Sequence, residues 1–154
     1  DVTFIGAAVA CPIIGFIDSH TNWRHRLMWI SPIIAAAIMV AIIFIPAMNN
    51  GLLLILLFML GTCLSPYILN FVIANQISNK KNQGINIGFV NMLSVGSAPI
   101  IQPLIGFMMD TNTGALKNHS IIQYQKSLWI IPVMLIIASV VAYYLPRNNN
   151  YKKV

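Results

Sequence analysis

The sequence predicts an all-α membrane protein with about five transmembrane helices. Of its 154 residues, 58% are hydrophobic and 8% are charged, whereas about a quarter of the residues of a soluble domain are charged. Backbone groups in lipid must be hydrogen-bonded within the protein, which leaves helices or a closed barrel. The apolar run 52–60 lacks the apolar–polar alternation of a barrel strand. We therefore expect helices.

The expected spans follow one another within a single transmembrane region that takes in residues 1–154. About 20 helical residues are needed to cross ~30 Å of hydrocarbon. The three middle runs are long enough for this, the last is just long enough, and the first is short, so we expect the chain to be a piece of a longer protein. The expected spans are residues 3–17, 27–48, 51–73, 85–109 and 127–145, followed by a tail at 146–154.

The distribution of basic residues predicts the orientation of the spans. Seven of the nine Lys and Arg residues lie in the connectors 18–26 and 75–84 and in the tail, which alternate with connectors that hold the other two. Basic connectors stay on the cytoplasmic side of a membrane. We therefore expect a multi-pass protein of the cell (cytoplasmic, or inner) membrane with a cytoplasmic C-terminus. Aromatic residues near the span ends fit interfacial anchors: Trp23, Trp29, Trp129, Tyr143 and Tyr144.

Several other classes of function find no support in the sequence. The net charge of +6 comes from residues in short connectors and not from a basic stripe with interleaved aromatics, so no nucleic-acid partner is expected. Cys11 and Cys63 lie inside apolar runs and indicate no disulfide framework. His20, His25 and His119 are scattered, so no metal or other cofactor is expected. With no Ser–His–Asp set, phosphate loop or carboxylate pair, we expect the chain not to be an enzyme.

Two segments of the chain resemble one another. Residues 12–18 read PIIGFID and residues 103–110 read PLIGFMMD, and each ends an expected span. By the orientation above, the first segment ends inside and the second outside. A similar motif in opposite orientation, three spans later, is typical of an inverted-topology repeat.

With these segments the chain resembles the major facilitator superfamily of secondary transporters, and specifically its last five helices. The connector with Gly15, Asp18, Arg24 and Arg26 resembles the second copy of the family's cytoplasmic gating motif, although Asp18 comes one residue early and no basic residue follows it directly. Residues 74–106 resemble the entry and body of the eleventh helix in organic-anion and sugar-phosphate-type facilitators.

The resemblance implies a partial C-terminal half of a transporter that moves a small solute, such as an organic anion or a sugar phosphate, by alternating access. The expected partners are then the lipid bilayer, the solute and a missing N-terminal half. The alternative is a small self-contained membrane protein with a role in assembly or in an oligomeric pore. The spans from Leu27 onward contain no Asp, Glu, Lys, Arg or His, and so offer no candidate for a proton relay.

Neutral polar residues in the third and fourth spans are the substrate-path candidates. One stripe of the fourth span holds small and polar residues: Gly84, Gly88, Asn91, Ser94, Ala98, Gln102 and Gly106. Asn91, Ser94 and Gln102 could line an aqueous path, or the stripe could be a packing surface between helices, which is the favoured interpretation for its glycines. Pro99 and Pro103 predict a kink in this span.

A second interruption is expected in the third span, near Gly61 and Pro66. Ser65, Asn70 and Tyr67 are candidates there. For Ser65 the alternative is a hydrogen bond to its own helix backbone, which is the commoner role of such a residue.

Overall fold

The computed structural model describes residues 2–21, 23–45, 49–79, 81–110, 125 and 127–145. These residues are almost entirely helical and contain no strand, so the expected all-α fold is confirmed for them. The elements are α1 (Val2–His20), α2 (Arg24–Phe44), α3 (Asn50–Leu64), the 3₁₀ turn η1 (Ser65–Ile68), α4 (Leu69–Ile77), α5 (Gln83–Gly96), α6 (Ala98–Asp110) and α8 (Ile130–Tyr144).

Several of these helices are long and apolar enough to cross a membrane. Four helical segments in the described residues meet that requirement by length and composition: Val2–His20, Arg24–Phe44, Asn50–Ile77 and Gln83–Phe107. The fifth expected span contains a shorter apolar helix of 15 residues, Ile130–Tyr144. At 1.5 Å per residue it is about 22 Å long, which is less than the ~30 Å of a hydrocarbon core.

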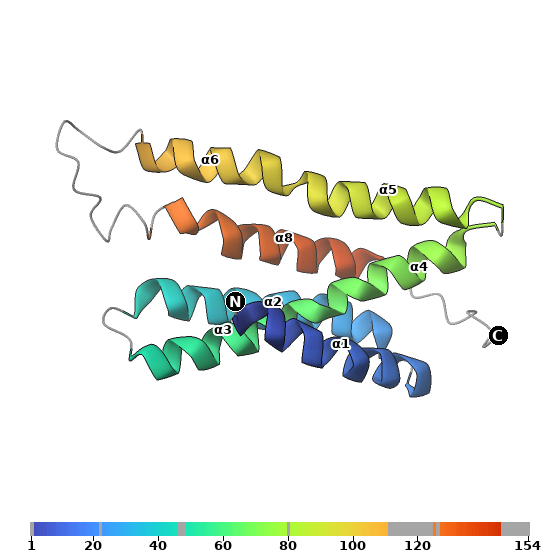
Figure 1. Ribbon diagram of the computed structural model, residues 1–154, viewed down its shortest axis with the longest axis horizontal. Helices are drawn as coiled ribbons and strands as arrows, with labels where there is room; N and C mark the ends of the chain where they lie inside the picture. The colour runs from blue at the N-terminus through green and yellow to red at the C-terminus, as the bar shows by residue number, and fades with distance from the viewer. Residues whose placement is uncertain are drawn as a thin grey trace.

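The helices lie roughly along one common direction (Figure 1). One end of the molecule holds the end of α1, the start of α2, the α4–α5 turn and the end of α8. The opposite end holds the end of α2, the start of α3 and the end of α6. The first of these ends carries Arg24, Arg26 and Lys81, and we call it the basic end. The connectors that the sequence assigns to one side of a membrane thus lie at one end of the fold.

Helices α1 and α3 cross in backbone contact, which two glycines permit. A Cβ atom on Gly6 would lie 2.3 Å from the carbonyl oxygen of Phe58, and one on Gly61 would lie 2.0 Å from that of Thr3. Small residues allow such close approach between apolar helices. A small buried core forms beside this crossing, from Ala10 and Ile14 of α1 and Leu69 of α4.

Helix α8 packs antiparallel to α2, and the contact is fixed at both ends. The Ser139 hydroxyl on α8 donates a hydrogen bond to the carbonyl oxygen of Trp29 on α2 at 2.6 Å. The Trp29 ring meets Tyr143 edge-on, with centroids 5.8 Å apart, and Phe44 meets Trp129 in the same way at 5.6 Å. The rings therefore hold the register of the pair.

Both expected interruptions of the long helices are confirmed. The third span changes to the 3₁₀ turn η1, with Pro66 in the first turn, before α4 resumes. The fourth span breaks at Ser97, between α5 and α6, which run end to end as one rod in Figure 1. Pro99 and Pro103 follow this break and supply no backbone N–H for the helical ladder.

Candidate functional site

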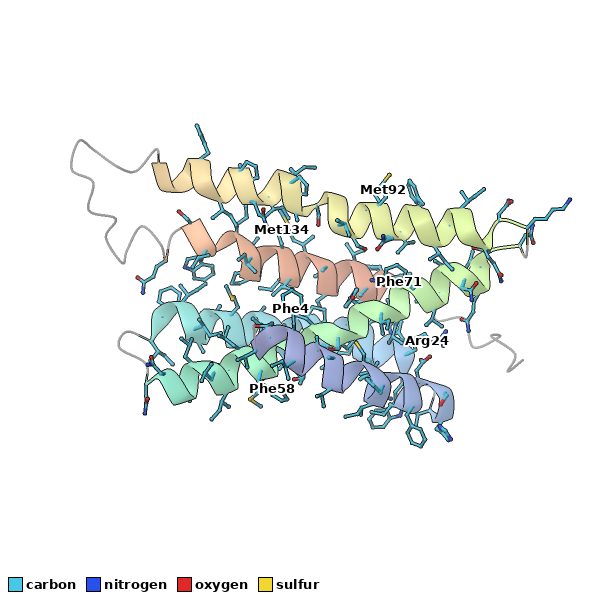
Figure 2. All side chains as sticks on the ribbon, in the orientation of Figure 1. Phe4, Arg24, Phe58, Phe71, Met92 and Met134 are labelled. Atoms are coloured by element: carbon cyan, nitrogen blue, oxygen red, sulfur yellow. The ribbon has the colours of Figure 1, made fainter. Side chains whose placement is uncertain are left out.

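A polar junction at the basic end joins three helices around Arg24 (Figure 2). The Arg24 Nε atom donates a hydrogen bond to Asp18 Oδ1 at 2.7 Å, and a terminal guanidinium nitrogen donates to the other carboxylate oxygen. The second terminal nitrogen donates to Gln76 Oε1 at 2.5 Å. The side chains of Arg24 and Asp18 are only 21% and 9% exposed. Partial burial and two-point geometry make this a stronger pair than an ordinary surface ion pair.

The local sequence explains why the pair forms. Asp18 lies in the last turn of α1 and Arg24 in the first turn of α2. Each charge alone would be unfavourable there, because a helix C-terminus carries partial negative charge and an N-terminus partial positive charge. The two side chains come together where α1 ends and α2 begins, so each offsets the other's unfavourable position.

A second set of hydrogen bonds ties α5 to the end of α4. The side-chain amide of Asn86 donates to the Ser78 hydroxyl at 2.5 Å, and that hydroxyl donates to the carbonyl oxygen of Ala74. Together with Gln76, these bonds connect α1, α2, α4 and α5 at the basic end. We refer to Asp18, Arg24 and Gln76 as the polar junction.

The other two residues of the gating-motif-like connector lie outside the polar junction. Gly15 has no heavy atom within 4 Å of the place where a Cβ would stand. Arg26 is exposed, and its guanidinium lies 5.9 Å from the centre of the Trp23 ring. Gln76, which sequence reasoning did not single out as a site residue, stands 52 positions from Arg24, and only the tertiary fold brings α4 and the start of α2 together.

A first recess opens between α4 and α5, beside the ends of α2 and α8. Its volume is about 350 Å³. Two of the candidate residues line it, Asn70 from α4 and Ser94 from α5. The Ser94 hydroxyl donates to the carbonyl oxygen of Val90 at 2.8 Å. The whole lining is Met28, Asn70, Ile73, Ala74, Val90, Leu93, Ser94 and Leu145.

A second recess lies between α6 and α8, where Figure 2 shows Met134. Its volume is about 420 Å³. Its polar side chains are Ser97 and the candidate Gln102, and the remaining lining is apolar. The whole lining is Ser97, Ala98, Ile101, Gln102, Ile105, Ile130, Ile131, Met134 and Leu135.

The two recesses follow one another along the α5–α6 rod. The first includes Ser94, the second begins at Ser97, and the helix break lies between them. At this break the Ser97 hydroxyl donates to the carbonyl oxygen of Ser94 at 2.8 Å. Polar groups from α4, α5 and α6 thus form a discontinuous line between the rod and the rest of the bundle. No lining residue of either recess is charged.

The remaining path candidates lie elsewhere. Ser65 is fully buried at the α1–α3 crossing, where its hydroxyl lies 2.9 Å from the carbonyl oxygen of Gly61 and 3.3 Å from that of Ala7. Tyr67 is 55% exposed and meets Phe71 edge-on. Asn91 is exposed and lines neither recess.

The glycines of the fourth-span stripe are not in close contact with another helix. Apart from neighbouring backbone of the same helix, no heavy atom of the described residues lies within 4 Å of the Cβ position of Gly84, Gly88 or Gly106. Among the described residues, the close approach that sequence reasoning favoured for these glycines is found instead at Gly6 and Gly61.

Comparison with known proteins adds no further constraint on the site. No protein-family model, curated protein or solved structure matches the chain. Within the part of the chain that the structure describes, no three His, Cys, Asp or Glu side chains come together as a metal site would require. The geometry of the recesses and the polar junction therefore carries the functional argument.

Proposed function

We propose that the chain is a multi-pass membrane protein and works as part of a secondary transporter that moves a small solute by alternating access. The observation that carries the proposal is the line of two recesses along a broken helix. In membrane proteins, interrupted helices and irregular backbone occur where they are buried in protein or line a polar cavity. Substrate sites of transporters are often built at such interruptions near the bilayer midplane.

In this proposal the polar junction closes the path at the cytoplasmic side. It holds α1, α2 and α4 together at the basic end, next to the first recess. A charge-assisted contact at the helix ends can break when the helices separate, because both charges then return to water at modest cost. The missing partner surface would be an N-terminal half of the same transporter.

The rival proposal is a self-contained membrane protein that assembles with copies of itself. The observation that favours it is the exposure of the α5–α6 rod. Its large apolar side chains include Phe89, which is 56% exposed, and Met92, which is 60% exposed and points away from the bundle in Figure 2. Lipid, further helices of a transporter or a second copy could each cover this surface. Solute uptake by liposomes that hold the 154-residue chain alone, above that of empty liposomes, would favour the self-contained protein, because the proposed transporter needs its N-terminal half.

The orientation is tested with single cysteines in a chain whose Cys11 and Cys63 have been replaced by alanine. We expect a cysteine at Asn82, at the basic end, to be protected from a membrane-impermeant thiol reagent in intact cells. A cysteine at Asn50, at the opposite end, should react. Labelling at Asn82 with protection at Asn50 would invert the orientation and remove the cytoplasmic gate from the proposal.

The path is tested by uptake of solute per inserted molecule of the intact carrier. We expect Asn70→Leu and Gln102→Leu to lower uptake about two- to tenfold, because each removes a hydrogen bond to solute worth roughly 0.5–1.5 kcal/mol. Insertion should not suffer, since leucine is favourable in a membrane helix.

Two matched substitutions serve as controls on the same rod. Ile100→Leu and Asn91→Leu change residues that line neither recess, and should leave uptake per inserted molecule within about twofold of the parent. If all four variants transport alike, the recesses are not the solute path.

A further inference from the structure

The hydroxyl groups of Ser94 and Ser97, beside the helix break, already donate their hydrogens to carbonyl oxygens of the protein. Ser94 donates its hydrogen to the carbonyl oxygen of Val90, and Ser97 donates its hydrogen to the carbonyl oxygen of Ser94. A hydroxyl has one donor hydrogen and two acceptor lone pairs. Each serine can therefore offer a bound molecule only acceptor lone pairs, unless its helix bond is given up.

The two amides of the recesses supply both kinds of hydrogen-bonding group. The side chains of Asn70 and Gln102 make no hydrogen bond to any other described residue. Each offers an N–H₂ donor group and a carbonyl acceptor. The combined lining is therefore richer in acceptors than in donors, and a complementary molecule must itself bring hydrogen-bond donors.

The lack of charged side chains in the two recess linings also limits which solutes they can bind. The linings of both recesses contain no Lys, Arg or His that could neutralise an anion, and no Asp or Glu that could neutralise a cation. An unpaired ion in an apolar setting pays a desolvation penalty of several kcal/mol or more. An anion would also face the lone pairs of two serines, because phosphate and carboxylate oxygens accept hydrogen bonds and have none to donate.

We propose that the recesses bind a neutral solute that presents hydroxyl or amide donors beside an apolar face. This inference rests on the proposed solute path and narrows it, and it replaces the organic anion or sugar phosphate that the family resemblance implies. The volumes of about 350 and 420 Å³ suit a molecule of the size of an aryl glycoside. The Ile, Leu, Val and Met side chains of the linings would contact the apolar face.

The test uses the full 154-residue chain in phosphatidylcholine nanodiscs, with Cys11 and Cys63 replaced by alanine. A reporter cysteine replaces Ala74 in the first recess or Ala98 in the second, which leaves all four polar side chains in place. Labelling by N-ethylmaleimide is timed with three competitors: phenyl β-D-glucopyranoside, its tetra-O-methyl ether and phenyl phosphate. The glucoside is neutral and has hydrogen-bond donors. The ether is neutral and has only acceptors, and the phosphate is an anion that acts mainly as an acceptor.

We expect the glucoside to slow labelling of at least one reporter, with half-protection at a concentration at least tenfold below that of either other competitor. A cysteine at Asn82, outside both recesses, should label at the same rate throughout. Gln102→Leu should weaken the protection of the Ala98→Cys reporter severalfold, whereas Ile100→Leu should not.

Three results would overturn the inference: protection by phenyl phosphate at the same or a lower concentration, equal protection by the methyl ether, or no protection by the glucoside. The assay measures binding without transport, so its outcome is separate from that of the uptake experiment. Protection without uptake would contradict the transporter proposal alone, and uptake with protection by phosphate would contradict the solute class alone.

Discussion

Replacing Gly61 with alanine is expected to lower the free energy of unfolding by about 1–3 kcal/mol, the range for overfilling a packed contact. The added Cβ would lie 2.0 Å from the carbonyl oxygen of Thr3, which is a backbone atom and cannot turn aside. Helix α1 must therefore move away from α3. That movement would also lengthen the 3.3 Å contact between the Ser65 hydroxyl and Ala7.

The measurement is unfolding in mixed micelles with an increasing fraction of dodecyl sulfate, followed by tryptophan fluorescence. Gly88→Ala is the matched control, since nothing lies within 4 Å of its Cβ position. There alanine should stabilise the helix by about 0.5–1 kcal/mol, because glycine has the higher conformational entropy in the unfolded chain. Opposite signs at the two positions are the expected result. Equal effects would mean that α1 and α3 do not cross in backbone contact.

The contrast between these glycines shows that a sequence pattern does not predict which helix faces come into contact. Periodicity places Gly84, Gly88 and Gly106 on one stripe, which is the usual signature of a helix contact. It identifies a face of a helix but not what lies opposite that face. Gly6 and Gly61 are on different helices, and their roles depend on where α1 and α3 cross.

The helices and their interruptions could be predicted because they depend on local chemistry. Long apolar runs need internally bonded backbone, and proline removes a helical N–H at a fixed position. The 3₁₀ turn at Pro66 and the break before Pro99 follow from these rules. The bounds of the fifth span were harder to predict, since 127–145 is mostly apolar from end to end while the continuous helix in it is Ile130–Tyr144.

The candidate site could be predicted only in part, because its residues meet through tertiary packing. Asp18 and Arg24 are six positions apart, and a short turn is enough to bring them together. Asn70 and Ser94 come to line one recess only because α5 folds back along α4. Asn91 and Ser94 share one stripe of the fourth span, but only Ser94 lines a recess, so periodicity alone does not separate them.

Asp18→Asn is expected to destabilise the protein by about 1–3 kcal/mol, the range for losing a hydrogen-bonded charge. The carboxylate is only 9% exposed, so its bonds to Arg24 are little weakened by water. The substitution removes the carboxylate from beside the guanidinium in the first turn of α2, where the helix dipole disfavours positive charge. The loss is partly offset, since neutral Asn also removes a negative charge from the end of α1.

A double-mutant cycle with Arg24→Gln isolates the pair from these separate effects. We expect the double variant to be less destabilised than the sum of the two single variants, with a coupling energy of about 1–2 kcal/mol in the same micelle unfolding assay. Arg26→Gln is the matched control, because Arg26 is exposed and its guanidinium lies over the Trp23 ring, 5.9 Å from the ring centre. Its effect should stay within about 0.5 kcal/mol. A coupling energy near zero between Asp18 and Arg24 would show that the polar junction does not hold the basic end together, and would remove its role as the gate of the proposed path.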